Sequence, residues 1–195
     1  VSVNSLSAIT GAGAVCETQT ITLSDASVGG TWSSSDDAIG SVDASGIVTG
    51  VSSGGVDITY TLGASYVTHA VTVNTSPFIV ASPVGGTAVC AGSSTGLSVA
   101  GASTYVWSPS PGLSATSGAS ITATPTVTTT YSVTGTDISG CTSTSGATVT
   151  VNPIPTVGAG SDVTIYNGSS TTLTASGGTT YSWMPAASLS ASTSV

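Results

Sequence analysis

The feature that most constrains the fold is an internal repeat with a spacing of 76 residues. Residues 90–119 and 166–195 align without a gap, and 13 of their 30 positions are identical. The identities include Trp107 and Trp183, which a bias towards small residues does not explain. A chain built from units of this length is expected to fold as similar modules in a row, not as one shared globule.

A recurring tetrad, Val-Ser/Thr-Val-Asn, marks the ends of the repeated units. It closes an alternation of Val and Thr at residues 71–74 and 149–152, and residues 1–4 fit the same pattern. The boundaries predict, in order, the last strand of a preceding module, two complete modules and the first half of a third: residues 1–4, 5–74, 75–152 and 153–195. Because half a module exposes a core face and an unpaired sheet edge, we expect further strands from the chain or from another copy to complete it.

Short alternating runs inside each unit predict β-strands. Val56, Ile58, Tyr60 and Leu62 alternate with other residues, which is the period of a strand with one buried face. The long polar side chains that favour helices are almost absent, and Lys and Arg are missing altogether. Turn sequences such as Asp-Ile-Ser-Gly at residues 137–140 separate the runs. Roughly seven strands per module, at spacings of about 8–12 residues, predict an all-β fold of tandem β-sandwiches.

Aromatic residues are the candidates for the module cores. Each unit has one tryptophan, and tyrosines fall on later strands in phase with apolar neighbours. Five aromatic side chains are predicted core residues: Trp32, Trp107, Trp183, Tyr60 and Tyr131. Tyr105 and Trp107 could instead stack on a sugar ring if they were exposed, so the burial of Trp107 distinguishes the two interpretations.

The charge balance excludes several functions. The chain has no Lys or Arg, eight Asp and Glu, and a net charge of −8. Without cations it cannot neutralise nucleic-acid phosphates or bind an acidic membrane surface. No apolar run approaches the roughly 18 residues of a membrane-spanning helix, so we predict no membrane insertion. The single histidine, His69, shares the parity of Val67 and Val71 and is predicted to be structural; we therefore expect no enzyme and no cofactor.

Calcium is the one metal that the acidic residues could bind. Ca²⁺ prefers clusters of carboxylate oxygens, and two groups of aspartates fall in neighbouring loops. The candidate ligands are Asp36, Asp37 and Asp43 in the first module, and Asp137 and Asp162 near the boundary of the second and third. None belongs to an Asp-x-Asp-x-Asp-Gly loop, and solvated turn residues are the alternative interpretation.

Several motifs resemble known families. Residues 31–36, 41–51 and 56–60 resemble the bacterial immunoglobulin-like group 2 domain, which builds the stalks of intimin- and invasin-type adhesins. Tyr-Val-Trp-Ser-Pro at 105–109 and Asp-Ile-Ser-Gly-Cys at 137–141 resemble the Ig-like or PKD-like repeats of giant secreted Bacteroidetes proteins. These proteins include gliding-motility adhesins and are typically exported by the type IX secretion route. The resemblance implies an extended extracellular array of immunoglobulin-like modules and fixes no ligand.

The same resemblance implies a disulfide between Cys90 and Cys141, inside the second module. Cys16 aligns with Cys90, but Tyr66 occupies the region where its partner is expected. We therefore expect Cys16 to be an unpaired thiol, either buried or used in an intermolecular link. Three cysteines without a Cys-x-x-Cys motif, together with one histidine, do not fit a zinc site.

Three functional hypotheses fit this sequence. The first is a structural or adhesive segment of a long protein on the bacterial cell surface, with neighbouring modules of the same chain as its partners. The second is a fibre subunit whose half module is completed by strands of another copy. The third is a non-catalytic carbohydrate-binding region of a secreted enzyme. A surface or glycan ligand stays unidentified in all three.

Overall fold

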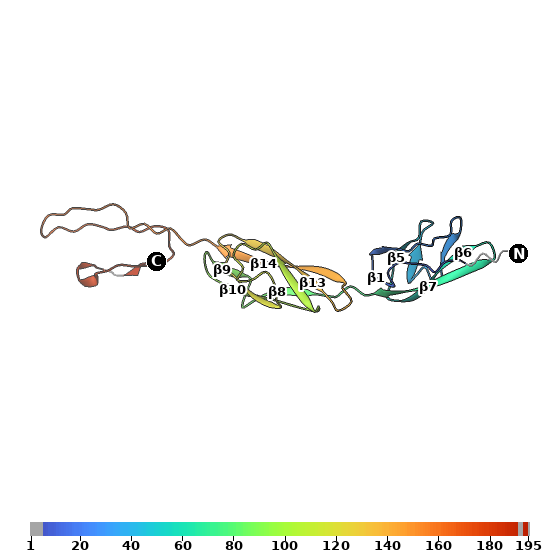
Figure 1. Ribbon diagram of the computed structural model, residues 1–195. Coiled ribbons are helices and arrows are strands. Elements are labelled where there is room, and N and C mark those ends of the chain that lie inside the picture. The colour runs from blue at the N-terminus through green and yellow to red at the C-terminus, as the bar shows by residue number, and fades with distance from the viewer. Residues whose placement is uncertain (1–5, 191–192, 195) are drawn as a thin grey trace.

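Two β-sandwiches account for most of the ordered secondary structure of the protein (Figure 1). The computed structural model describes residues 6–190 and 193–194, so the strand predicted at residues 1–4 lies outside the described residues. Buried side chains form two separate clusters, one within residues 9–73 and the other within residues 79–149. Figure 1 shows the sandwiches end to end, with the last segment continuing beyond the second. The predicted all-β fold class of tandem sandwiches is confirmed.

The first sandwich has a four-stranded and a three-stranded sheet, in the orders β1-β7-β6-β3 and β2-β5-β4. Its strands are β1 (Ala14–Cys16), β2 (Thr20–Thr22), β3 (Thr31–Ser34), β4 (Gly40–Val42), β5 (Ile47–Gly50), β6 (Gly54–Leu62) and β7 (Ser65–Asn74). The alternation predicted in β6 is observed, because Val56, Ile58 and Tyr60 are all buried. The short β1 runs parallel to β7, whereas the other pairs are antiparallel.

The second sandwich has sheets in the orders β11-β13-β14-β9 and β12-β10-β8. Its four-stranded sheet repeats that of the first sandwich, whereas its three-stranded sheet has β10 at the centre, between β12 and β8. Its strands are β8 (Val80–Val84), β9 (Ala88–Cys90), β10 (Thr95–Ala100), β11 (Thr104–Ser108), β12 (Ser120–Ala123), β13 (Thr129–Thr136) and β14 (Thr142–Asn152). Here β9 runs parallel to β14, as β1 does to β7. The last long strand of each sandwich therefore ends beside a short parallel strand that ends in a cysteine.

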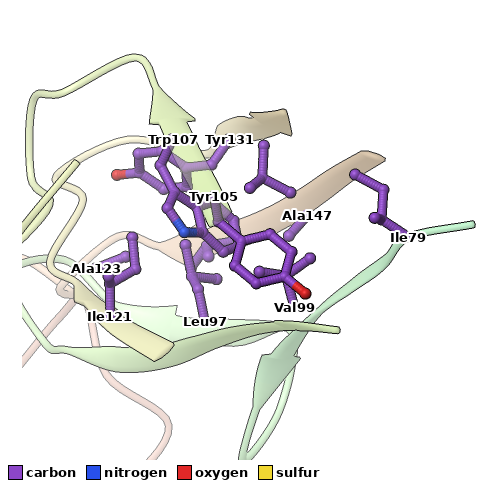
Figure 2. Close-up of a cluster of buried hydrophobic side chains, with 11 residues drawn as sticks. Ile79, Leu97, Val99, Tyr105, Trp107, Ile121, Ala123, Tyr131 and Ala147 are labelled. Atoms are coloured by element: carbon purple, nitrogen blue, oxygen red, sulfur yellow. The ribbon is translucent and has the colours of Figure 1, made fainter. Parts of the chain in front are cut away.

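The core of the second sandwich lies between its two sheets (Figure 2). Trp107 of β11 and Tyr131 of β13 face Leu97 of β10, and their exposed fractions are 2%, 0% and 0%. The Trp107 indole Nε1 donates a hydrogen bond to the carbonyl oxygen of Gly118 at 2.9 Å, so its polar atom is satisfied although the ring is buried. The predicted core positions of Trp107 and Tyr131 are observed.

The first core uses its aromatic residues differently. Tyr60 is buried, and its hydroxyl donates to the carbonyl oxygen of Ser27 at 2.7 Å and accepts from the Gly30 backbone N–H at 2.8 Å. Trp32 is only half-buried and packs against Tyr60 with ring centroids 4.8 Å apart. Tyr60 thus occupies the core as predicted. Trp32, predicted to be a core residue too, is only partly buried and packs against this core as the cross-strand neighbour of Tyr60.

Residues 153–190 do not form a third sandwich. The described secondary structure after Asn152 is the pair β15 (Tyr181–Ser182) and β16 (Thr193–Ser194) with a short 3₁₀ helix, Ala186–Ser188. The prediction that Trp183 is a core residue is wrong, because this residue is half-buried and belongs to neither core cluster. Among the described residues no second sheet lies over it, and it lines an open cavity together with Ile165 and Leu189.

Candidate functional site

The junction between the two sandwiches is the candidate functional site, because a disulfide crosses it. Cys16 at the end of β1 is bonded to Cys141, and their Cα atoms are 5.6 Å apart. The bond joins residues 125 positions apart in the sequence. The predictions of a Cys90–Cys141 pair and of an unpaired Cys16 are therefore both wrong.

Strand length explains why Cys90 and Cys141 do not pair. Cys141 directly precedes β14, whereas Cys90 is paired in register with Asn152 at the other end of that strand. At about 3.3 Å per residue, the two ends of β14 lie about 35 Å apart. A disulfide requires Cα atoms within roughly 7 Å, so the two cysteines of the second sandwich cannot reach each other.

Cys16 is held at the junction by two neighbouring strands. It lies in register with Asn74, the last residue of β7, and the Glu17 backbone N–H donates to the Asn74 carbonyl oxygen at 2.9 Å. On its other side, a Cβ added at Gly50 would lie 2.5 Å from the Cys16 carbonyl oxygen. Only glycine allows this close approach of β5, so the backbone that presents Cys16 is fixed from both sides.

Cys141 is held by the hairpin between β13 and β14. The Asp137 carboxylate oxygen Oδ1 accepts hydrogen bonds from the backbone N–H groups of Ser139, at 2.8 Å, and Cys141, at 2.9 Å. The Asp137 backbone N–H donates to the Cys141 carbonyl oxygen at 3.0 Å. Cys141 is fully buried, and its Sγ lies 4.0 Å from the Asn74 carbonyl oxygen, where β7 leaves the first sandwich.

The peptide linker is the second connection across the junction. It consists of residues 75–79, between the end of β7 and the start of β8. Pro77 is buried, and Ile79 already belongs to the second core. Phe78 between them is 85% exposed. A short linker with a buried proline and a covalent bond beside it connect the same two sandwiches at two points.

The calcium candidates do not converge on one site. Asp36 and Asp43 use Oδ1 to accept hydrogen bonds from backbone N–H groups two residues later, in the same way as Asp137. Such contacts stabilise turns and occupy an oxygen that a metal would need. Within residues 6–190 and 193–194, no three His, Cys, Asp or Glu side chains come together as a metal site. Asp37 and Asp162 are exposed.

Neither of the other two candidate sites forms a binding surface. His69 lies on β7 opposite Ile58 and is half-buried, in phase with the core residues Val71 and Val73. Tyr105 and Trp107 are 8% and 2% exposed, so they offer no platform for a sugar ring. In the described parts of the chain, no helix has the length and apolar character needed to cross a membrane.

The sequence reasoning missed the junction as the place where the cysteines act. One signal was present: Cys16 and Cys90 occupy the same position in successive repeats, so each must lie at the same end of its sandwich. Cys141, one long strand before the end of the second unit, must lie at the opposite end. A cysteine of one unit can therefore meet only the cysteine of its neighbour.

The sequence of the first sandwich matches the model of one known family. Residues 3–75 match the bacterial Ig-like domain (group 2), which confirms the resemblance found in residues 31–60. No curated protein matches the chain. The match covers less than half of the chain, and the Bacteroidetes resemblance of the later repeats stays a prediction.

Solved structures of multidomain proteins are similar to the chain at low identity. Domains 4 and 5 of the S-layer protein SbsC share 13% identity over 77% of this chain and 99% of that chain, with a TM-score of 0.40. A C-terminal 282-residue fragment of intimin, in complex with the intimin-binding domain of its translocated receptor, shares 16% identity over 78% of this chain and 66% of that chain, with a TM-score of 0.48. Extracellular domains 3–5 of Drosophila OTK share 12% identity over 76% and 62% of the two chains, with a TM-score of 0.36.

Proposed function

We propose that this chain is a structural segment of an extracellular repeat protein, which holds other parts of that protein at a distance. The observation that supports this most directly is the Cys16–Cys141 bond, which joins two otherwise separate sandwiches end to end. In this proposal residues 5–74 and 75–152 are complete modules, residues 153–195 begin a third, and the chain has no catalytic role.

The chemistry of the junction supports a location outside the cell. Disulfides persist in oxidising compartments and are rare in the bacterial cytosol. The group 2 match of residues 3–75 supports the same location, because the resemblance links that domain to adhesin stalks. The finer assignment, to a gliding-type adhesin exported by the type IX route, rests on the motifs at residues 105–109 and 137–141.

The linker and the disulfide together restrict pivoting between the two sandwiches more than the linker alone does. With only the linker at residues 75–79, the second sandwich could pivot about a single strand of backbone. The disulfide adds an attachment from β1 to the hairpin before β14, so pivoting would have to distort one of the two sandwiches. The pair is therefore expected to act as one rod and to keep its length in solution.

Small-angle X-ray scattering of the full chain tests this proposal. The oxidised protein should give an elongated distance distribution, and the Cys16→Ser/Cys141→Ser double variant should give a broader one. Cys90→Ser is the matched control, because it also removes a cysteine but leaves the junction bond in place. Mass spectrometry of a non-reduced peptic digest should identify the Cys16–Cys141 link.

Two results would overturn the proposal. One is a distribution that the double serine variant leaves unchanged, since the disulfide would then not determine the shape. The other is a compact oxidised protein in which the two sandwiches fold back on each other.

A second function, assembly into fibres, is favoured by the segment after Asn152. Leu173 is 43% exposed and Trp183 is half-buried, whereas their repeat equivalents Leu97 and Trp107 are buried in the second core. Strands from another copy could cover these side chains. Sedimentation velocity should then show concentration-dependent oligomers that Leu173→Ser suppresses; a monomer at all concentrations would exclude this candidate.

A further inference from the structure

The end of β9 repeats the local structure that holds Cys16. Cys90 is paired in register with Asn152, as Cys16 is with Asn74. The residue after each cysteine donates its backbone N–H to that asparagine's carbonyl oxygen, at 3.0 Å in the second sandwich and 2.9 Å in the first. Both cysteines therefore lie beside the strand that leads out of their sandwich.

The turn after each cysteine is also the same. Thr18 and Gly92, each two residues after a cysteine, both have a positive φ, of 65° and 80°. The next residue donates its backbone N–H to the cysteine's carbonyl oxygen, at 3.0 Å for Cys16 and 2.9 Å for Cys90. The two cysteines are thus presented by equivalent backbone at equivalent ends of two sandwiches.

The two cysteines differ in whether they form a disulfide. Cys16 is bonded to the hairpin cysteine of the next sandwich, whereas Cys90 is an exposed free thiol. The chain leaves β14 towards the third repeat through Pro155, three residues after Asn152, just as it leaves β7 through Pro77, three residues after Asn74. A complete module that follows Asn152 would therefore meet Cys90 as the second sandwich meets Cys16.

We propose that Cys90 is the attachment point of a second disulfide between modules. Its partner is a cysteine directly after the last hairpin of an immunoglobulin-like module docked at the end of β14, in the place that Cys141 occupies in the second sandwich. This inference rests on the proposed tandem function and extends the same covalent link to the next junction.

The bond forms by thiol–disulfide exchange with a low-molecular-weight disulfide such as oxidised glutathione. The Cys90 thiolate attacks one sulfur of glutathione disulfide and releases one glutathione thiolate. The partner thiolate then attacks the mixed disulfide at the Cys90 sulfur and releases the second. The two cysteines lose two protons and two electrons, and one glutathione disulfide becomes two glutathione molecules.

An inserted module tests the proposal in the full chain. A second copy of residues 75–152, with serine in place of its own Cys90, is inserted after Asn152, and the protein is oxidised in glutathione buffer. We expect no thiol that reacts with maleimide after denaturation, no bound glutathione, and two linked peptide pairs in a peptic digest. One pair joins Cys16 to the first hairpin cysteine, and the other joins Cys90 to the inserted one.

Cys90→Ser in the first copy is the matched control and should leave the inserted hairpin cysteine unlinked, as a thiol or as a glutathione adduct. Two unlinked cysteines, as thiols or as glutathione adducts, with the Cys16 link intact would overturn this inference and leave the proposed function standing. A Cys90–Cys90 link between chains would overturn it as well. Loss of the Cys16–Cys141 link would instead count against the proposed function.

The unmodified chain gives a second measurement that does not depend on the insertion. Native protein treated with oxidised glutathione should gain one glutathione, on Cys90, and Cys90→Ser should gain none. A native chain that takes up no glutathione would show that Cys90 is inaccessible and would overturn the inference.

Discussion

Residues 75–152 and 153–190 share sequence landmarks but fold to different extents. In both, a tyrosine hydroxyl hydrogen-bonds with the backbone N–H and C=O of the residue three positions earlier: Tyr105 with Ala102 and Tyr181 with Gly178. A bridge between Val106 and Ser117 recurs 76 residues later in the pairing of β15 with β16. The turns are therefore the same, although only the first region buries its aromatic residues.

This difference shows which features depend on neighbouring residues and which depend on strands far away in the sequence. The tyrosine turn spans four residues and forms in both regions. Burial of Trp107 depends on β13 and β14, which come more than 20 residues later and carry Tyr131, Val133 and Val149. The described part of residues 153–194 contains no equivalents of those strands, so the same tryptophan position stays half-buried.

The largest expected contrast is between alanine substitutions at the two tryptophans. Trp107→Ala removes a fully packed ring and should lower the free energy of unfolding of the second sandwich by about 3–5 kcal/mol. Trp183→Ala removes a ring that no second sheet covers and should change it by less than about 0.5 kcal/mol. Hydrogen exchange of the β13 and β14 amides measures both values. Equal losses would show that Trp183 supports the second sandwich as strongly as Trp107 does.

A smaller contrast is expected from the tyrosine turns. Tyr105→Phe and Tyr181→Phe each delete two hydrogen bonds to backbone and should each destabilise the local turn by about 1 kcal/mol. Only Tyr105→Phe should lower the urea midpoint of the second sandwich, because only that turn is part of a packed core. A similar shift of this midpoint by Tyr181→Phe would contradict the conclusion that only the Tyr105 turn is part of a packed core.

The smallest effect concerns Tyr131, which has no counterpart in residues 153–190. Burial raises the pKa of Tyr131 above the ordinary value of about 10, and a side-chain hydrogen bond with Thr129 opposes this with a smaller effect. Above pH 10 the unfolded chain loses this proton while the folded chain keeps it. The free energy of unfolding should therefore fall as pH rises past about 10.

Tyr131→Phe is the variant that isolates this pH dependence. Below about pH 10 it should cost about 1 kcal/mol by deleting the hydrogen bond to the Pro111 carbonyl oxygen. Between pH 8 and pH 11 its urea midpoint should fall less than that of the unaltered chain. Parallel curves for the two proteins would refute the role of Tyr131.

The sequence was sufficient for features that depend on local pattern. Alternation at residues 56–62 predicted a strand with one buried face, and the Asp-Ile-Ser-Gly turn predicted the hairpin before Cys141. The sequence was insufficient for features that depend on contacts between distant parts of the chain. The pairing of Cys141 depends on the 11-residue length of β14, and the exposure of Trp183 depends on strands outside its own segment.

The junction bond also determines which residues would carry tension. A pull applied before Cys16 and after Cys141 passes through the sulfur atoms and along β14, so the 124 residues between the two cysteines lie off the load path. While the disulfide is intact, unfolding either sandwich therefore adds little of the length of these 124 residues to the stretched chain. Reduction of the bond would add up to about 440 Å of extensible backbone at roughly 3.5 Å per residue. Oxidation state, more than sheet strength, should therefore determine how far this molecule stretches.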